Sequence, residues 1–320
     1  MACSRSNWLA VIDMDTLQVE ATVAVGTEPI AVVHDPVRDR IFTTDARTST
    51  LSVVDGATLE LIGQVAVGAY CAGAGIHVGR RKVLTGNTAD GTVTMVDADS
   101  LAVLATVPAR FASGSIAVDE ARDRTYVVNF GDDTVTVIDT DENRSLTTVP
   151  VGAAPCKIDL DPDRGVGYVA NSLTSELAVL DLEELVVTDR IPVERAPVGL
   201  AACGDRVYAV NRGAGSVSII GSADHSEWGR IPVGDAPGDV AVDRDGRTLY
   251  VSNAGSCDVS VVVDLLDDPA PVPEAPTGGL SDLVGSRLPP WDLYDARTGG
   301  RMTSEAWAGH KYILNFFASW

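Results

Sequence analysis

The chain has 320 residues, 45% of them hydrophobic, so it is long and apolar enough to bury a large core. Its 45 acidic residues outnumber its 24 basic residues and give a formal net charge of −21. Since nucleic acids and anionic membrane surfaces are bound by clustered Lys and Arg, this balance argues against both as partners.

A repeat organises residues 1 to about 264. Its clearest copy runs from Arg124 to Asp139, where the β-branched and aromatic run Thr125–Val128 is followed by turn-forming residues and by Thr134–Ile138, which alternates with period two. Asn129 and Asp139 end these two runs, and we expect them to be turn caps. Residues equivalent to Asp139 recur every 40 to 43 positions, at Asp13, Asp55, Asp97, Asp181, Gly221 and Asp264.

Two further columns complete each repeat. Ten or eleven residues before the closing residue stand Cys3, Asp45, Asn87, Asn129, Asn171, Asn211 and Asn253. After the closing residue comes a strand that ends near Val-Gly, as at Gly26, Gly68, Gly152 and Gly234. Each unit therefore holds four short strands. A period of about 40 to 45 residues with four strands is typical of a β-propeller blade.

The residues of the repeated motif make the prediction of a β-propeller more specific. Tyr126-Val-Val-Asn129, Tyr168-Val-Ala-Asn171, Tyr208-Ala-Val-Asn211 and Tyr250-Val-Ser-Asn253 are each followed by a second strand and, in most copies, by a Pro-Val-Gly-like turn. In these features residues 1 to about 264 resemble the YVTN family of β-propeller repeats. The resemblance implies an all-β propeller of four-stranded blades.

The strand types do not occur in equal numbers. We count six copies of the first strand type, six of the second, seven of the third and six of the fourth, the surplus strand being Trp8–Asp13. A seven-bladed parent that lacks its first two strands explains this count best. A six-bladed ring with one spare strand is the alternative.

The repeat stops after Asp264, where we place a domain boundary. Residues 265–283 form a proline-rich, acidic linker that is expected to be extended. Residues 284–320 contain Val284-Gly285, Pro289-Pro290, Leu293-Tyr294-Asp295, Lys311 and Asn315-Phe-Phe-Ala-Ser-Trp320. This segment resembles the opening of the TlpA and ResA type of thioredoxin-fold (redoxin) oxidoreductases, so an incomplete α/β thioredoxin-like segment is expected there.

The resemblance also implies a function for the longer parent. In that family the nucleophilic cysteine of a Cys-x-x-Cys pair follows the residue equivalent to Trp320, so we expect this chain to stop just before it. The thiolate is the attacking group, and therefore we expect no thiol–disulfide exchange by the chain as given. No signal peptide or transmembrane run is visible, and we expect the parent protein to be extracytoplasmic without membrane insertion.

Candidate binding residues lie where the loops depart from the repeat. Propellers commonly bind partners on the face that carries the Val-Gly loops and the turns after the Asn column. The irregular residues on this face are Arg47, Tyr70, Arg110, Phe111, Asp132, Asp133, Arg195 and Arg212. Their mixture of arginine, aromatic and acidic residues suits a protein or a small carboxylate-bearing ligand.

Three functions remain open at this point. The first is a binding or scaffold propeller fused to a thiol–disulfide oxidoreductase. The second is a propeller enzyme, lactonase- or lyase-like, although the residues predicted at the channel mouth supply no convergent acid, base or metal ligands: Ile30, Gly114, Cys156, Val198 and Gly238. The third is a purely structural interaction module. The five cysteines and four histidines are not spaced like the ligands of a metal site, so we expect no metal. We also expect no cofactor, and we expect the chain to be a monomer.

Overall fold

The computed structural model describes residues 1–13, 18–243, 246, 248–263, 292–294 and 301–303. The chain forms two compact units, Met1–Arg190 and Ile191–Trp320. Every regular element among the described residues is a β-strand, as the sequence predicts. These residues accordingly contain no helix long and apolar enough to cross a membrane.

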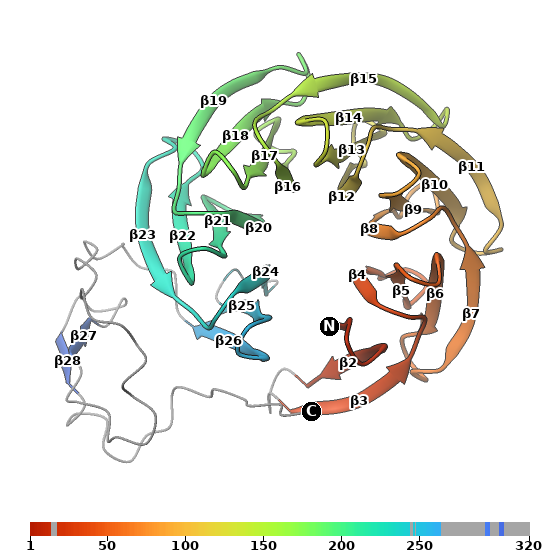
Figure 1. The fold of residues 1–320 in the computed structure, drawn as a ribbon, viewed down its shortest axis with the longest axis horizontal. Coiled ribbons are helices and arrows are strands. Elements are labelled where there is room, and N and C mark those ends of the chain that lie inside the picture. Colours follow the sequence, from red (N-terminus) through yellow and green to blue (C-terminus); the bar gives the residue numbers. More distant parts are fainter. Residues whose placement is uncertain (14–17, 244–245, 247, 264–291, 295–300, 304–320) are drawn as a thin grey trace. The chain divides into compact units, whose positions relative to one another are not determined.

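The first unit contains one three-stranded and four four-stranded antiparallel sheets. Their strands, sheet by sheet, are β1 (Ala2–Cys3), β2 (Trp8–Ile12), β3 (Val19–Ala24); β4 (Pro29–Asp35), β5 (Arg40–Asp45), β6 (Thr50–Asp55), β7 (Leu61–Ala66); β8 (Cys71–His77), β9 (Lys82–Asn87), β10 (Thr92–Asp97), β11 (Val103–Pro108); β12 (Ser113–Asp119), β13 (Arg124–Asn129), β14 (Thr134–Asp139), β15 (Arg144–Pro150); and β16 (Pro155–Asp161), β17 (Val166–Asn171), β18 (Glu176–Asp181), β19 (Val187–Pro192). Figure 1 shows β4, β8, β12 and β16 on the inner side of these sheets and β7, β11 and β15 on the outer side.

The second unit contains the remaining sheets. They are formed by β20 (Pro197–Cys203), β21 (Arg206–Asn211), β22 (Ser216–Gly221), β23 (Glu227–Pro232); β24 (Pro237–Val242), β25 (Thr248–Asn253), β26 (Asp258–Val263); and β27 (Asp292–Tyr294), β28 (Arg301–Thr303). The pair β27–β28 falls in the segment predicted to be thioredoxin-like. The linker 265–283 and most of residues 284–320 lie outside the described residues.

Residues 1–263 thus supply seven blade sheets, and the predicted β-propeller is confirmed. The six-bladed alternative is wrong. Our count missed one strand of the second type, because only Ala2–Cys3 of β1 is present to pair with β2. The sheet β1–β3 has no first-type strand and the sheet β24–β26 has no fourth-type strand among the described residues.

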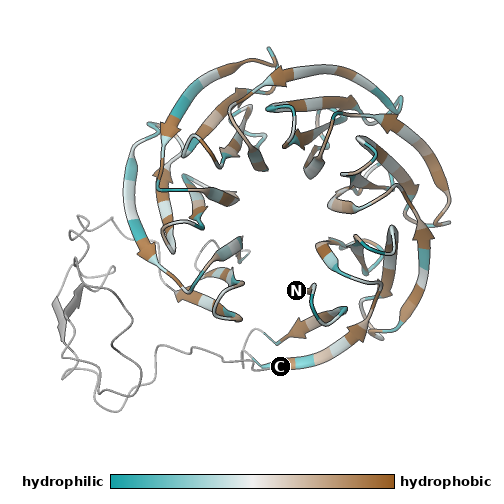
Figure 2. Cartoon of the chain, in the orientation of Figure 1, coloured by the Kyte–Doolittle hydropathy of each residue, from teal (hydrophilic) through white to brown (hydrophobic). Residues whose placement is uncertain are grey.

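Apolar side chains from adjacent sheets form the core. One cluster joins Tyr126, Val128 and Val137 from β12–β15 to Val169 and Leu180 from β16–β19. The tyrosines of the repeated motif, Tyr126, Tyr168 and Tyr208, are among the largest fully buried side chains. Figure 2 shows hydrophilic positions most clearly on outer strands such as β19 and β23. A blade therefore buries its faces only against its neighbours, as expected for repeat architectures.

The Asn column does more than end a strand. Asn129 is fully buried, and its Nδ2 donates hydrogen bonds across the hairpin to Oγ1 of Thr134 (3.1 Å) and Thr136 (2.8 Å), so it joins β13 to β14 rather than capping the turn backbone as we expected. The Val-Gly column packs on the same amides. A Cβ on Gly152 would lie 2.5 Å from Nδ2 of Asn171 and 2.6 Å from its Cγ. Two sequence columns therefore form one contact in the blade.

The closing aspartates are turn caps, as predicted. Oδ1 of Asp97 accepts hydrogen bonds from the backbone N–H groups of Asp99 (3.1 Å) and Ser100 (2.7 Å), and these bonds lower the pKa of Asp97. Oδ1 of Asp139 accepts one from Glu142 (2.9 Å). The acidity of the chain is thus partly structural.

Candidate functional site

Two kinds of loop meet on the face where we predicted binding residues. In the β12–β15 blade, the loop that precedes β12 pairs with the turn after β13: Phe130 N–H donates to Ala112 O (3.2 Å), and Gly131 N–H donates to Phe111 O (3.3 Å). Equivalent bonds occur in the neighbouring blades, for example from Thr88 N–H to Tyr70 O (3.1 Å). The face is therefore built from loops fixed by backbone hydrogen bonds.

Phe111 and Phe130 form an exposed aromatic pair on this face. Their relative exposures are 66% and 52%, which is unusual for phenylalanine. The ring of Phe111 lies close over Gly131, since a Cβ on that glycine would stand 2.3 Å from Cδ1 of the ring. Arg110 precedes Phe111, is exposed, and makes no side-chain hydrogen bond or ion pair within the described part of the chain. We call Arg110, Phe111 and Phe130 the aromatic patch.

Asp132 and Asp133 serve the loops themselves. Oδ2 of Asp132 accepts a hydrogen bond from Phe111 N–H (3.0 Å), and Oδ1 of Asp133 accepts one from Ala154 N–H (2.9 Å). Asp133 also adopts a left-handed backbone (φ 56°). The two carboxylates therefore hold the aromatic patch and the next loop in place. A direct partner contact for either residue stays a prediction.

Arg47 and Tyr70 converge on a residue that sequence reasoning missed. Arg47 Nε donates to Oε2 of Glu28 (2.7 Å), and the Tyr70 hydroxyl donates to Oε1 of the same carboxylate (3.3 Å). Glu28 precedes β4, whereas the equivalent residues elsewhere are Tyr70, Ala112, Ala154, Ala196 and Ala236. Its departure from this mostly alanine column was the signal that could have revealed it.

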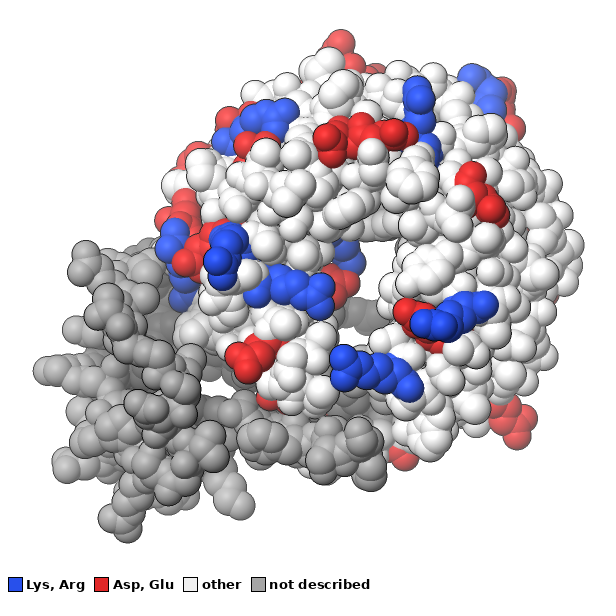
Figure 3. All heavy atoms as spheres, in the orientation of Figure 1, with Lys and Arg blue, Asp and Glu red and all other residues white. Residues whose placement is uncertain are grey.

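The two predicted residues of the second unit lie on paired loops of the β20–β23 blade. Arg195 Nε donates to Gly213 O (3.1 Å), and Arg212 N–H donates to Ala196 O (2.9 Å). Arg195 is thus used to close its own loop. Figure 3 shows basic and acidic side chains scattered over the visible surface, without a broad patch of one sign.

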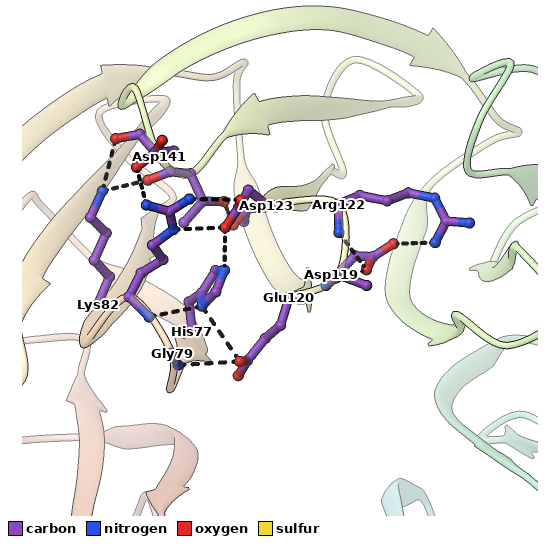
Figure 4. Close-up of polar contacts among 12 residues, drawn as sticks. His77, Gly79, Lys82, Asp119, Glu120, Arg122, Asp123 and Asp141 are labelled. Atoms are coloured by element: carbon purple, nitrogen blue, oxygen red, sulfur yellow. Dashed lines mark hydrogen bonds and ion pairs between the residues drawn. The ribbon is translucent and has the colours of Figure 1, made fainter.

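A dense polar network connects the turns of two neighbouring blades at the ends of β8 and β12 (Figure 4). His77 replaces the aspartate found at this position in four other blades, and its Nδ1 accepts a hydrogen bond from Arg80 N–H (3.2 Å). Its Nε2 then carries the proton and bonds Oδ1 of Asp123 (2.9 Å). Arg80 also reaches Asp123 with two hydrogen bonds of 2.8 Å each.

The charged side chains of this network pair with one another or with backbone groups. Glu120 accepts hydrogen bonds from the N–H groups of Val78 (2.8 Å) and Gly79 (3.2 Å). The buried Nζ of Lys82 donates to Thr140 O, to Asp141 O (3.1 Å) and to Oδ1 of Asn143 (2.9 Å). Hydrogen bonding to Arg80 and His77 lowers the pKa of Asp123 to about 2. The charged groups of the network are thus paired with one another across two blades.

Metal and acid–base chemistry find little support among the described residues. They contain no group of three or more His, Cys, Asp or Glu side chains placed to hold a metal ion. All five cysteines are free thiols, and Cys71 is fully buried, which raises the pKa of its thiol to about 11. Of the residues predicted at the channel mouth, Ile30 is 41% exposed and Cys156 is partly buried.

Comparison with known proteins supports a propeller. The family model described as "Lactonase, 7-bladed beta-propeller" matches residues 9–264. No curated protein matches the chain significantly. Among solved structures, the hydrazine synthase of Kuenenia stuttgartiensis aligns with a TM-score of 0.74 and 17% identity over 82% of this chain and 91% of that one.

Two further structures show the same architecture. A functionally unknown protein from Desulfotomaculum acetoxidans DSM 771 aligns with a TM-score of 0.71 and 14% identity, covering 81% of this chain and 90% of that chain. The structure of U3-55K aligns with a TM-score of 0.65 and 14% identity, covering 77% and 81%. At such identities the likeness concerns the fold alone.

Proposed function

The chain belongs to the family of seven-bladed β-propellers described as lactonases, and from this premise we propose that it is a propeller module that binds a protein partner through the aromatic patch. The observation that carries the proposal is the exposure of Phe111 and Phe130, 66% and 52%, on loops fixed by backbone hydrogen bonds. Rigid aromatic residues beside an arginine are typical anchors of protein interfaces. Because the backbone of their loops is held by hydrogen bonds, the loops lose little conformational entropy when a partner binds.

The experiment is affinity capture with the full chain from an extract of the source organism, followed by quantitative mass spectrometry. In the variant Phe111→Ala/Phe130→Ala, we expect the retained partner to fall by about tenfold or more, since a central aromatic anchor is worth more than about 1 kcal/mol. The control is Val37→Ala/Leu61→Ala, which removes exposed apolar side chains outside the patch (73% and 42% exposed). Equal capture by both variants and the unaltered chain would refute the proposal.

We further propose that the propeller presents this partner to a thiol–disulfide oxidoreductase domain in an extracytoplasmic parent protein. Support comes from the resemblance of Val284–Trp320 to the opening of that domain and from the linker before it. The sequence has no cysteine after Cys257, so the chain itself should not accelerate reduction of a disulfide substrate by dithiothreitol. Turnover above the uncatalysed rate would contradict this assignment.

A lactonase is the second candidate, and the family match favours it. Lactone hydrolysis requires a general base or a metal-activated water. The inner strand β16 carries Lys157 and Asp159, which are partly exposed. A pH-stat assay with aliphatic lactones of several ring sizes tests this candidate. Turnover that Asp159→Asn abolishes would establish a lactonase, and absence of turnover across the series would leave the binding module.

A further inference from the structure

A polar pocket of about 500 Å³ lies between the β1–β3 and β4–β7 blades on the loop face. Its wall is formed by three loops of the first unit. The turn between β1 and β2 supplies Ser4, Arg5 and Asn7, the loop before β4 supplies Thr27 and Glu28, and the turn after β5 supplies Arg47. The volume falls within the range of small-molecule sites, and the lining contains no aromatic or aliphatic side chain larger than a methyl group.

Hydrogen bonds fix the wall of this pocket. Oδ1 of Asn7 accepts a hydrogen bond from Glu28 N–H (2.9 Å), which ties the β1–β2 turn to the next blade. Both carboxylate oxygens of Glu28 are occupied, one by Arg47 Nε (2.7 Å) and the other by the Tyr70 hydroxyl (3.3 Å). Glu28 therefore orients Arg47 and leaves the terminal nitrogens of that guanidinium available. Two backbone bonds, from Ala46 N–H to Glu28 O (3.0 Å) and from Arg47 N–H to Thr27 O (3.1 Å), complete the frame.

The charge of the lining is opposite to that of the protein. The lining holds two arginines, Arg5 and Arg47, and one carboxylate, that of Glu28, so the pocket carries a net charge of about +1 in a chain of net charge −21. Arg5 is exposed and makes no ion pair or side-chain hydrogen bond to any residue that the structure describes. An unpaired arginine beside an oriented one is the arrangement that binds an anion.

The donors of the pocket favour a carboxylate as the class of anion. Phosphate sites characteristically use several free backbone N–H groups. Four of the six lining residues have their N–H group engaged: Asn7 N–H bonds Cys3 O (3.0 Å), Thr27 N–H bonds Thr48 Oγ1 (3.2 Å), Glu28 N–H bonds Asn7 Oδ1, and Arg47 N–H bonds Thr27 O. The side-chain donors of the lining are the two planar guanidinium groups of Arg5 and Arg47 and the hydroxyls of Ser4 and Thr27. Guanidinium forks match the planar geometry of a carboxylate.

From these contacts we propose that the pocket binds a small aliphatic carboxylate, with Arg5 and Arg47 as its ligands. The site is separate from the aromatic patch, and it goes beyond the protein partner proposed above. Glu28 acts as a positioning residue that holds Arg47, and the hydroxyls of Ser4 and Thr27 donate to the remaining carboxylate oxygens.

Isothermal titration calorimetry of the full chain with succinate, at low ionic strength and pH 7, tests the proposal. We expect saturable binding with a dissociation constant on the order of 1 mM. Arg5→Met and Arg47→Met should each weaken it by about tenfold, the loss expected for one charge-assisted hydrogen-bonding group. Arg81→Met is the matched control, because Arg81 is 61% exposed and pairs with Asp99 outside the pocket; it should leave binding unchanged.

Inorganic phosphate serves as the competing probe. Absence of saturable succinate binding, binding by either arginine variant that is as tight as that of the unaltered chain, or tighter binding of phosphate than of succinate would each overturn the proposal. The variants replace exposed side chains, and an unaltered thermal unfolding midpoint will confirm that they fold. Phe111→Ala/Phe130→Ala should titrate with succinate like the unaltered chain, so failure of the protein-binding proposal and failure of the carboxylate site give different results.

Discussion

His77 and Asp123 connect two neighbouring blades, with Nε2 of a buried imidazole 2.9 Å from a carboxylate oxygen. The contact exists because a histidine stands in the aspartate column. In three other blades the equivalent arginine pairs with the aspartate of its own turn, as Arg122 does with Asp119 (2.8 Å). With His77 in that position, Arg80 instead reaches Asp123 on the next blade.

This arrangement predicts a pH-dependent contribution from Asp123. Its folded-state pKa, about 2, lies below its ordinary value of 3.8. The carboxylate therefore stabilises the fold fully above about pH 4, and this stabilisation is lost as the pH falls toward 2. Asp123→Asn should lower the free energy of unfolding by about 1 kcal/mol at pH 7, since the side chain is partly screened by solvent.

Urea unfolding at pH 7, 4 and 2.5 measures this effect. The difference between Asp123→Asn and the unaltered chain should shrink as the pH falls. Glu142→Gln is the control, because the Glu142 side chain is 62% exposed and, among the residues that the structure describes, pairs with Arg144 alone; it should cost less than about 0.5 kcal/mol. A difference that is constant with pH would contradict the role of the charge.

The contact between the Gly and Asn columns predicts that alanine will not be tolerated at Gly152. A Cβ there would stand 2.5 Å from Nδ2 of the buried Asn171, so either the amide or the loop must move. We expect a loss of about 2 kcal/mol in the free energy of unfolding. Gly229→Ala is the matched control, since its Cβ would meet nothing within 4 Å. Comparable unfolding midpoints for both variants would disprove the steric argument.

Val127→Thr tests how the buried amides are satisfied. In the β8–β11 blade, Thr85 Oγ1 donates to Oδ1 of Asn87 (3.1 Å). Val127 stands at the position of Thr85, and no described protein group donates to Oδ1 of Asn129. The new hydroxyl should find this acceptor, and stability should change by less than about 0.5 kcal/mol.

The same replacement at Val137 provides the contrast. Val137 is fully buried in an apolar cluster, so its threonine variant would bury an unpaired hydroxyl and lose about 2 kcal/mol. Thermal unfolding of both variants measures the difference. If Val127→Thr is as unstable as Val137→Thr, the proposed hydrogen bond does not form.

The cysteines should differ sharply in reactivity. Burial raises the pKa of Cys71 to about 11, whereas Cys257 is exposed. Because the thiolate is the reactive form, brief treatment of the folded chain with iodoacetamide at pH 8 should modify Cys257 and leave Cys71 intact. Peptide mapping by mass spectrometry reads the result, with a urea-unfolded sample as the control in which both thiols react. Rapid labelling of Cys71 in the folded chain would contradict its burial.

The fold could be predicted because short sequence patterns specify each strand and turn and because these patterns recur along the chain. Strand residues, turn residues and the Tyr and Asn columns return at a fixed interval, so each copy supports the interpretation of the others. The contact of Gly152 with Asn171 could not be inferred, because it joins two columns across strands. The short β1 was left out of the strand count although Cys3 stands in the Asn column, because two residues are too few to show a strand pattern.

The candidate site was harder to predict. Departures from the repeat did point to Arg47, Tyr70 and Phe111, which lie on the paired loops. Glu28, however, is one of 45 acidic residues, and its importance arises only when the fold brings Arg47 and Tyr70 to its two oxygens. Asp132 departs from the repeat too, but its carboxylate supports a loop. A departure from the repeat therefore does not by itself tell whether a residue binds a partner or holds its own loop in place.

One recurring contact gives the first unit a polarity. The residue that opens the second strand of a blade, Arg40, Lys82 or Arg124, donates to a backbone carbonyl 58 residues further on, at Ala98, Thr140 or Leu182. In these three cases the side chain of one blade donates to the blade that follows it in the chain, not to the blade before it. Under a stretching force the unit should yield asymmetrically, because pulling away a later blade removes a carbonyl acceptor from a buried or half-buried cation, whereas the earlier blade keeps its own acceptors. Val166 holds the equivalent position in β17, and its side chain has no hydrogen-bond donor. The series of these bonds therefore ends in the last blade of that unit.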